Sequence, residues 1–456
     1  MNPQLDLADL RSRVTGPVLA PGEEGFADEV SGFNLATQYS PDVAVGVTNE
    51  ADVVEAVRFA ARHRLPVRVL ATGHGPAEPV TDGLLIVTKR LDALEIDPTT
   101  NVATVGAGLK WEAVQAAAAP LGLTAITGSS PDVGAVGLTL GGGLGPLVRS
   151  HGFTSDYARS FRVVTRAGEA VTASAEENPD LFWALRGGKG GLGVVTELRI
   201  RLVELPVIHA GAVIFDTPHI EAVLRGWIDW TASAPDDVTT SVAIVRFPEF
   251  EFVPEPLRGH HAIALRFAYP GSEEDGERIA APLRALAPSI MDTIGRLPTS
   301  MMGLIHSDPT DPLPAWDFGL LLASVDQELA TALLAQAGAG TQSPLLVTEL
   351  RHLGGRAAID VPEGSAAGGR VGSFSFYAVG VPDPSLFESV LPAVGARILE
   401  AIAPWTSPET TVNFAGRFRS PEHFASAWPP AIFTRLSAVK KSYDPLGLFT
   451  YGPKAG

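Results

Sequence analysis

Two glycine-rich segments carry residue types that could hold a phosphate-bearing cofactor. The first, residues 71–75, reads Ala-Thr-Gly-His-Gly and follows the short apolar run 67–70. The second runs from Gly128 to Gly145 and contains a Gly-Gly-Gly triplet. Because glycine has no Cβ, backbone N–H groups in such turns can approach phosphate oxygens closely. A phosphate cradle does not require a histidine, so His74 needs its own explanation, either chemistry on the bound group or an ordinary hydrogen bond.

Several common kinds of site do not fit the sequence. Residues 141–145 are not followed by Gly-Lys-Ser/Thr, and no acidic residue closes a βαβ unit about 20 residues further on, so neither a P-loop nor a dinucleotide fingerprint is present. Turn geometry alone remains an alternative explanation of this glycine cluster. The ten histidines lack His-x-x-x-His spacing, and the absence of cysteine excludes disulfides, thiolate metal sites and cysteine nucleophiles. We therefore expect no metal site.

Length and composition indicate a globular protein with a small-molecule substrate. At 456 residues, of which 45% are hydrophobic and 19% charged, the chain is long enough for roughly three domain-sized units. The net charge of −17 argues against a nucleic-acid or anionic-membrane partner. No signal-peptide pattern is visible at the start, and no apolar stretch approaches the ~18 residues of a membrane helix. We expect a cytoplasmic protein and leave its oligomeric state open.

The elements that would position the glycine turns alternate between strand and helix over the first two hundred residues. Residues 51–61 place Val53 and Val57 at helical spacing, which predicts an amphipathic helix. In 194–202 apolar and charged residues alternate, which predicts a strand with one exposed face. A further helix is expected at 110–119, and strands are expected at 43–47, 66–70, 84–87, 102–105, 161–165 and 170–173.

After about residue 205 the glycine clusters become sparse and the pattern becomes α+β, which suggests a substrate-binding region. Residues 354–372 are rich in Gly, Ala and Ser and predict a mobile loop. Strands are expected at 212–215, 238–245, 262–268, 346–353 and 374–377, and helices at 220–232, 273–286 and 433–443.

The order of these motifs resembles one group of flavoproteins. The turn around His74 is followed by a Gly-Ser-Ser-Pro-x-Val-Gly pattern from Gly128, by a Leu-Arg-Gly-Gly sequence ending at Gly188, and by Gly-Val-Val-Thr ending at Thr196. Residues 435–445 read Arg-Leu-x-x-Val-Lys-x-x-Tyr-Asp-Pro and are similar to that family's C-terminal signature. The chain thus resembles the berberine-bridge-enzyme-like FAD-linked oxidases of the vanillyl-alcohol-oxidase / p-cresol-methylhydroxylase flavoprotein superfamily.

The resemblance implies an α+β fold with two parts. Residues 1–205 and 409–456 would form a two-part FAD-binding domain of the vanillyl-alcohol-oxidase type. Residues 206–408 would form a central α+β substrate domain, in which an antiparallel sheet backed by helices covers the isoalloxazine ring.

The resemblance also implies FAD as the cofactor. In the family, the histidine of the first glycine turn is bonded to the 8α-methyl group of FAD, and this role falls to His74. Such a bond raises the flavin potential and retains the cofactor in an open site. Many relatives add a bond from a cysteine where this chain has Ser130, so a mono-covalent FAD is expected. The family usually has glycine where this chain has Thr72. The expected cofactor-binding residues are Ala71, Thr72, Gly73, His74, Gly75, Gly128, Ser129, Val133, Gly134, Gly137, Gly141, Gly142, Gly145, Gly152, Val195 and Asn413.

Val133 occupies the family's gatekeeper position beside the reactive C4a of the flavin. A valine there resembles oxidases, in which O₂ reaches the reduced ring, whereas a leucine resembles dehydrogenases. One additional methylene is enough to fill the pocket that oxygen must enter. We therefore expect O₂ as the electron acceptor, with a dehydrogenase as the alternative.

The catalytic base does not follow from the resemblance. Relatives often carry a Tyr-x-Asn-Tyr stretch, and this chain has Thr-Val-Asn-Phe at 411–414, which keeps the asparagine and lacks both phenols. The candidates are Tyr377, Glu349 and His352, with Tyr157 as a further possibility. Ordinary sheet packing is the alternative for Tyr377, and a surface ion pair with Arg351 is the alternative for Glu349.

The expected activity is transfer of hydride from a C–H bond of a small organic substrate to flavin N5, followed by reoxidation with O₂ to H₂O₂. The missing tyrosines favour a natural-product, alkaloid-like amine or alcohol over a plain sugar. They also keep open a non-redox cyclase or isomerase that uses the flavin as a scaffold.

Overall fold

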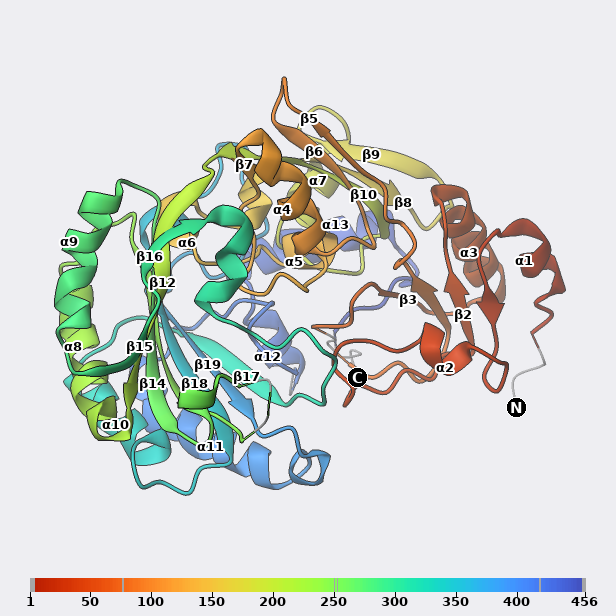
Figure 1. The fold of residues 1–456 in the computed structure, drawn as a ribbon. Helices are drawn as coiled ribbons and strands as arrows, with labels where there is room; N and C mark the ends of the chain where they lie inside the picture. The colour runs from red at the N-terminus through yellow and green to blue at the C-terminus, as the bar shows by residue number, and fades with distance from the viewer. Residues whose placement is uncertain (1–4, 76–77, 250, 252, 418–419, 453–456) are drawn as a thin grey trace.

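Short helices and four β-sheets make up the part of the chain that the structure describes. A computed structural model describes residues 5–75, 78–249, 251, 253–417 and 420–452. Figure 1 shows two regions side by side, with the N-terminal part of the chain around small sheets and the middle of the chain around one large sheet. The chain after residue 409 returns from the large sheet toward the N-terminal region.

The N-terminal region contains a four-stranded sheet, a five-stranded sheet and a strand pair. In the four-stranded sheet, ordered β1-β2-β4-β3, the neighbours β2, β4 and β3 run parallel. The five-stranded sheet, ordered β5-β6-β10-β8-β9, is antiparallel throughout. The strands are β1 Val18–Leu19, β2 Val43–Gly46, β3 Val67–Leu70, β4 Leu84–Val87, β5 Leu94–Asp97, β6 Val102–Gly106, β7 Leu123–Thr124, β8 Ala158–Val164, β9 Ala170–Ser174, β10 Val194–Arg201 and β11 Val203–Glu204.

The large sheet has eight strands and is antiparallel in every pair. Its order is β15-β12-β14-β13-β18-β19-β17, and β16 also pairs with β12. The strands are β12 Val207–Asp216, β13 Thr239–Arg246, β14 His261–Tyr269, β15 Ser289–Asp292, β16 Gly295–Pro298, β17 Asp317–Leu322, β18 Leu345–His352 and β19 Phe374–Gly380.

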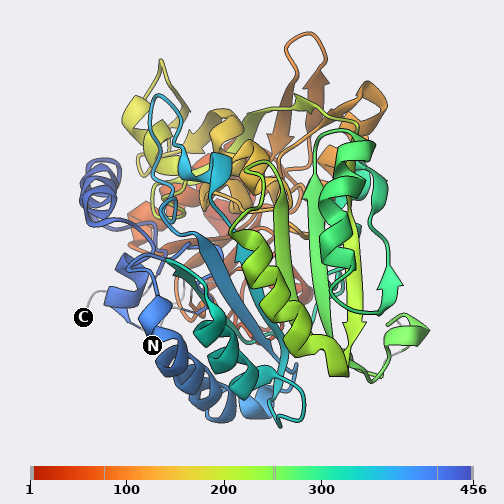
Figure 2. The same ribbon diagram turned by 90° about the vertical axis from the view of Figure 1, so that its left-hand side faces the viewer.

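Four helices, α8 to α11, cover one face of the large sheet, as Figure 2 shows. Apolar side chains of this face, among them Phe267, Leu350 and Phe376, pack against α8 to α11 in one buried cluster. The opposite face carries a smaller apolar cluster that includes Ala243 and Ala264, and beside it the buried polar residues Ser241 and Arg266. The helices are α1 Ala8–Arg13, α2 Phe26–Glu29, α3 Glu50–His63, α4 Trp111–Ala118, α5 Ala135–Leu140, α6 Val148–His151, α7 Pro179–Leu185, α8 Ile220–Thr231, α9 Glu273–Arg284, α10 Gln327–Ala337, α11 Val390–Ile402, α12 Pro421–Ala425 and α13 Pro430–Tyr443.

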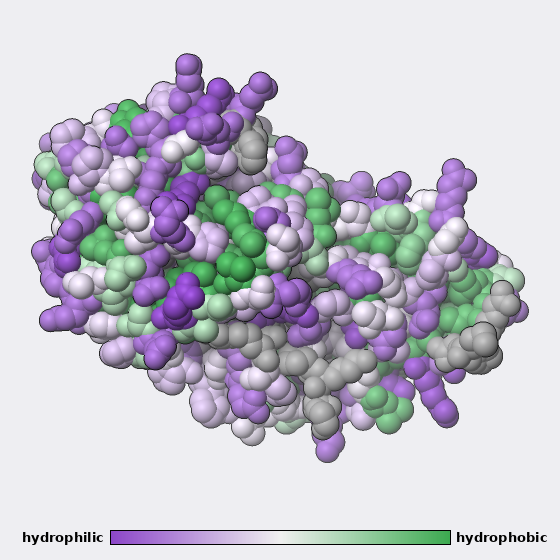
Figure 3. Space-filling view, turned by 90° about the horizontal axis from the view of Figure 1, so that it is seen from below, coloured by the Kyte–Doolittle hydropathy of each residue, from purple (hydrophilic) through white to green (hydrophobic). Residues whose placement is uncertain are grey.

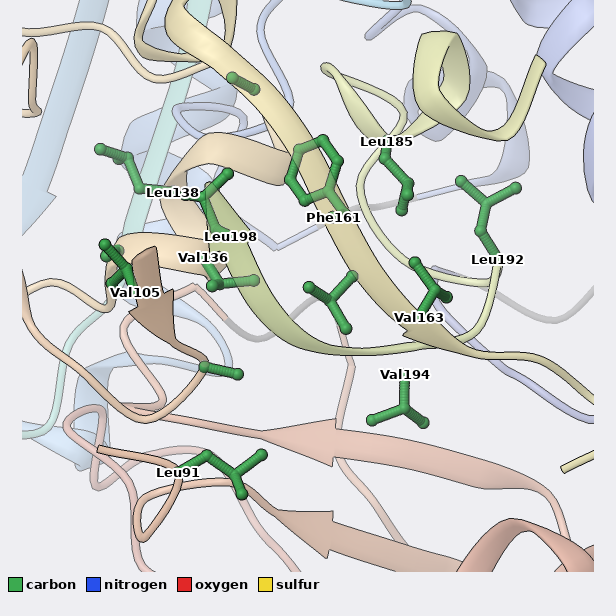
Figure 4. Packing of buried hydrophobic residues seen from close by; sticks show 14 of the residues in the cluster. Leu91, Val105, Val136, Leu138, Phe161, Val163, Leu185, Leu192, Val194 and Leu198 are labelled. Atoms are coloured by element: carbon green, nitrogen blue, oxygen red, sulfur yellow. The ribbon is translucent and has the colours of Figure 1, made fainter. Parts of the chain in front are cut away.

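A second core lies among the N-terminal sheets and includes the returning tail. Phe161 and Leu198 pack beside Val136 of α5 within this core (Figure 4). The tail contributes Trp428 and Phe449 to the same cluster, and the backbone of Val67 in β3 exchanges hydrogen bonds with residues 448 and 450. The two-part arrangement expected from the resemblance is thus visible in the packing, while the boundaries at 205/206 and 408/409 stay a prediction.

Elements with a clear local pattern lie close to the expected residues. The helix expected at 51–61 is α3, which starts at Glu50 because the Asn49 side chain accepts a hydrogen bond from the N–H of Asp52. The expectation at 128–145 missed the short helix α5, which glycines flank. The loop expected at 354–372 contains a 3-10 helix, Gly355–Ala358, and its Arg370 forms an ion pair with Asp156; its mobility stays a prediction.

One face of the molecule is largely polar. Figure 3 shows hydrophilic residues spread over this face with hydrophobic patches between them. Within the described ranges, no helix combines the length and the hydrophobicity needed to span a membrane.

Candidate functional site: a flavin cradle facing a polar sheet

The turn after β3 is held in shape by a second loop. The N–H of Phe33 donates to the carbonyl of Thr72 and the N–H of Asn34 donates to that of Gly73. Gly73 has a φ of +74°, and a Cβ there would lie only 2.7 Å from the Cα of Gly32. Only glycine fits this position, because the left-handed conformation and the close backbone contact both exclude a side chain.

The imidazole of His74 is fixed by contacts on three sides. Its ring stacks on Phe33, with 3.9 Å between ring centroids. Its Nδ1 lies 2.9 Å from the hydroxyl of Thr72, which itself accepts the N–H of Gly134. Because that hydroxyl can donate its own proton to Nδ1, we assign the ring proton to Nε2. Nε2 faces Asp132 at 3.3 Å but makes no hydrogen bond.

The electrostatics of this turn keep His74 neutral. Burial lowers the pKa of His74 to about 4, although the nearby Asp132 carboxylate opposes this shift. Lys110 forms an ion pair with Asp132 and so holds the carboxylate in place. A neutral imidazole keeps a lone pair on one nitrogen, which is the form required for a bond to carbon.

The arrangement fits the flavin expected from the sequence. Nε2 of His74 and Oγ of Ser130 are both buried without a hydrogen-bond partner, and they lie on the two turns that the resemblance assigns to the flavin. A cleft of about 430 Å³ opens beside the His74 turn and is lined in part by Thr72, Phe33 and Asp132. A Cβ on Gly75 would meet no atom within 4 Å, so the outer side of the turn is open. His74 would hold the ring, and the glycine N–H groups would bind its phosphates.

A second group of expected cofactor residues gathers around Asn413. Its amide donates to the carbonyl of Leu138 in α5, and a Cβ on Gly141 would lie only 2.0 Å from its Oδ1. Lys189 donates from Nζ both to Oδ1 of Asn413 and to the carbonyl of Gly137, each at 2.7 Å. Sequence reasoning missed Lys189, although a lysine inside the run Gly187–Gly193 is an unusual residue that could have drawn attention.

Some of the other expected cofactor residues shape the glycine turns, and others lie away from the His74 turn. A Cβ on Gly145 would lie 3.0 Å from the Cα of Gly128, so these two glycines let the turn close on itself. Val195 lies in β10. Ala71, Val133, Gly142 and Gly152 lie outside helices and strands, but the nearest atoms to a Cβ on Gly142 and Gly152 belong to Phe153 and Asp156 respectively, rather than to the His74 turn.

The polar face of the large sheet carries a buried ionic cluster around Glu349. Arg266 and Arg351 each donate to a different oxygen of its carboxylate at 2.7 Å, and Ser241 also donates to it. Burial alone would raise the pKa of Glu349, but Arg351 and Arg266 outweigh it and lower that pKa to about 2. Glu349 is 2% exposed, so the sequence alternative of a surface ion pair with Arg351 is wrong: the pair exists, but β18 is an inner strand covered by other elements.

Tyr377 lies on the same face, directly opposite Glu349 in the β18–β19 ladder. Its hydroxyl donates to Oδ2 of Asp317 in β17 at 2.5 Å. Burial and the adjacent Asp317 raise the pKa of Tyr377 well above 10, and burial also raises the pKa of Asp317. Asp317 was not among the sequence candidates, because only the pairing of β17 with β19 brings it to Tyr377.

His352 lies on the other face of β18 and is separated from these two residues. It is three positions from Glu349, and in a strand an odd spacing reverses the direction of the side chain. Its ring stacks on Phe374 of the helix-covered core at 4.8 Å, and burial with the adjacent Arg149 lowers its pKa to about 3. Tyr157 donates to the carbonyl of His151 and lies under Arg201, so it also takes no part in the Tyr377 cluster.

Arg351 connects the sheet to the glycine turns. Its Nη1 donates to the hydroxyl of Ser129 at 3.1 Å, and its guanidinium lies 4.8 Å from the ring centre of Phe414. Tyr377 meets the edge of the same Phe414 ring at 5.3 Å. The polar face of the sheet therefore lies against the 128–133 turn and the segment around Asn413, which are the expected walls of the flavin site.

Replacement of Glu349 with alanine is expected to destabilise the fold by about 3–5 kcal/mol, because it removes the buried carboxylate that pairs with Arg266 and Arg351. Urea denaturation followed by circular dichroism measures the change. The matched control is Glu23→Ala, which removes a solvent-screened, exposed pair with Arg11 and should change the stability far less. Equal losses in both variants would contradict the burial argument.

Comparison with known proteins finds an FAD binding domain and several similar oxidases. Residues 41–174 match the family described as an FAD binding domain. The (R)-6-hydroxynicotine oxidase of Paenarthrobacter nicotinovorans is 26% identical over 96% of both chains. The crystal structure of 6-hydroxy-D-nicotine oxidase from Arthrobacter nicotinovorans has a TM-score of 0.84 at 23% identity, covering 100% of this chain and 99% of that one. The BBE-like 1 protein of Physcomitrella patens has a TM-score of 0.80 at 19% identity, covering 98% of both.

These matches agree with the fold and the site. The FAD binding domain match includes both glycine segments and the strands that carry them. The structural likeness extends over both the N-terminal sheets and the large sheet. Residues 41–174 therefore form an FAD binding domain, the chain is an FAD-dependent oxidoreductase, and its fold is that of the nicotine oxidase and the BBE-like protein.

Proposed function

We propose that this chain is an oxidase that removes hydride from a C–H bond of a small amine or alcohol and passes the electrons to O₂, giving H₂O₂. FAD, when bound, supplies the hydride acceptor at N5. The observation that carries the proposal is the pairing of two walls: the His74 turn on one side and the Tyr377–Asp317 pair on the other, connected by Arg351.

The proposed base is Tyr377. Because its hydroxyl donates to Asp317, the phenol oxygen keeps lone pairs that can accept a proton from a substrate O–H or N–H group. The phenol proton then passes to Asp317, whose pKa is raised by burial. Glu349 is a weak base because two arginines stabilise its charged form, and His352 lies on the wrong face. Substrate hydride leaves as this proton is taken up, so the charges balance.

The substrate class is proposed from chemistry and likeness together. The full-length relative is named for a hydroxynicotine, a cyclic amine, and the site offers a phenol–carboxylate pair in place of the two tyrosines of Tyr-x-Asn-Tyr. An alkaloid-like amine or alcohol is the class that we favour. Val133 at the gatekeeper position supports O₂ as the acceptor.

Anaerobic mixing tests the activity. The FAD-bound protein is mixed without oxygen with a panel of probes that includes 6-hydroxynicotine, secondary alcohols and oligosaccharides, and the visible flavin band is followed. Bleaching with an amine or alcohol probe, and recovery of the band with release of H₂O₂ on admitting air, is the expected result. Product formation without bleaching would instead establish a non-redox cyclase, and bleaching without reoxidation by air would establish a dehydrogenase.

We also propose that FAD is bonded to His74 and that Asp132 assists this attachment. Attachment would replace one hydrogen of the 8α-methyl group by Nδ1, once Nδ1 releases the Thr72 hydroxyl; the methyl proton would pass to solvent and two electrons would pass through the flavin to O₂. Asp132 faces the Nε2 proton at 3.3 Å and would stabilise the imidazole during this step. In Asp132→Asn the attachment of added FAD to the apoprotein should slow by about 10²-fold, the lower end of the range for a lost acid–base group. Acid-stable flavin measured over time gives the rate, and Asp132→Glu should restore part of it. An unchanged rate in Asp132→Asn would exclude this role.

A further inference from the structure

Lys189 occupies a position where a side chain is unusual. It lies in a glycine-rich turn with a φ of +61°, between Gly187 at +111° and Gly191 at +86°. Glycine adopts this left-handed conformation without strain, whereas a residue with a Cβ does not. A lysine there costs backbone strain, which points to a role for its side chain.

The ammonium group of Lys189 lacks a counter-charge. Its two hydrogen bonds go to neutral oxygens, those of Gly137 and Asn413. No ion pair found among the described residues includes Lys189. An ammonium has three N–H groups, so one donor and the whole positive charge remain available. Burial lowers the pKa of Lys189 to about 8, which leaves the group charged at neutral pH.

The neighbours of Lys189 place it between the two walls of the site. Gly137 is one turn of α5 beyond Gly134, whose N–H reaches Thr72 beside His74. Asn413 precedes Phe414, which contacts Tyr377. Lys189 therefore lies along the strip that a flavin ring would cover if one edge were held at His74 and its reactive centre faced Tyr377.

We propose that Lys189 donates its third N–H to the isoalloxazine ring of FAD and that its charge stabilises the reduced, anionic ring. This inference rests on the proposed flavin placement. Two-electron reduction adds negative charge to the ring system, and a cation within hydrogen-bond distance in a low-dielectric site stabilises that charge. The same cation has less effect on the neutral oxidised ring, so it raises the reduction potential.

The midpoint potential tests this role without any substrate. FAD content of wild type and Lys189→Met is measured first, and both are then reduced in equilibrium with reference dyes. Lys189→Met should keep its FAD, and its equilibrium constant for reduction should fall by at least about tenfold, the effect of one charged hydrogen bond, which corresponds to about 30 mV for a two-electron couple. Lys189→Arg, which keeps the charge, should recover most of the potential.

The matched control is Lys440→Met. Burial also lowers the pKa of Lys440 to about 8. Its ammonium lies over the rings of Phe424 and Trp428, so cation–π contacts stabilise its charge and it does not need a bound anionic group. Its loss should leave the potential unchanged. Lys189→Gly provides a variant without backbone strain if the methionine variant folds poorly.

Three results would overturn the inference: an unchanged potential in Lys189→Met and Lys189→Gly, an equal shift in Lys440→Met, or loss of FAD from the Lys189 variants with a normal potential in the flavin that remains. The last result would assign Lys189 to cofactor retention through the diphosphate. If the wild-type flavin titrates normally but no probe substrate reduces it, the proposed oxidase activity fails while the role of Lys189 stands.

Discussion

His74→Ala is expected to abolish acid-stable flavin while leaving the fold intact. In the wild type, acid precipitation should leave the yellow colour in the pellet, because the imidazole is the proposed attachment point. In His74→Ala the flavin should move entirely to the supernatant, since the chain contains no cysteine that could form another bond. Thermal stability should change little, because His74 makes one side-chain hydrogen bond and one ring contact.

Ser130→Ala is the control for this result. Ser130 lies on the neighbouring turn and its hydroxyl has no hydrogen-bond partner, so its removal should leave the pellet yellow. Acid-stable flavin that persists in His74→Ala would show that another residue carries the cofactor. A wild-type pellet without colour would contradict covalent attachment altogether.

Tyr377→Phe is expected to lower the rate of flavin reduction by about 10²–10⁴-fold, the range for a lost general base. FAD content and the melting temperature should stay near the wild-type values, because the ring and its contact with Phe414 remain. Anaerobic stopped-flow with a reactive probe measures the rate. Asp317→Asn should also slow reduction, and the double variant should be no slower than Tyr377→Phe, because the two residues act as one unit.

Two results would contradict the proposed roles of Tyr377 and Asp317. A reduction rate in Tyr377→Phe within about threefold of wild type would exclude the phenol as base, since a lost general base costs far more. Additive losses in the double variant would show that Asp317 acts independently of Tyr377.

The sequence predicted well those features that depend on local patterns. The α3 helix follows from apolar spacing and the Asn49 cap, and the His74 turn follows from a histidine between two glycines. The apolar run at 84–87 is β4 with the same bounds. These elements are set by residues close together in the chain, so a single sequence contains the information.

Features that depend on long-range pairing were not predicted. Asp317 and Tyr377 are 60 positions apart, and they meet only because β17 pairs with β19 in one register. The sequence did show that Glu349 and His352 cannot belong to one site, because a spacing of three places them on opposite faces of any strand. The role of Asp132 could also have been predicted, since it is the one carboxylate in the 128–145 glycine segment and requires a partner, and here the partners are His74 and Lys110.

The most direct test of the account is a peptide map of the acid-denatured, digested protein by mass spectrometry. We predict one peptide, the one that contains His74, whose mass is raised by that of FAD, with fragmentation placing the added mass on the imidazole. An unmodified His74 peptide, with free FAD or with the added mass on a different residue, would contradict the central claim that this turn anchors the flavin.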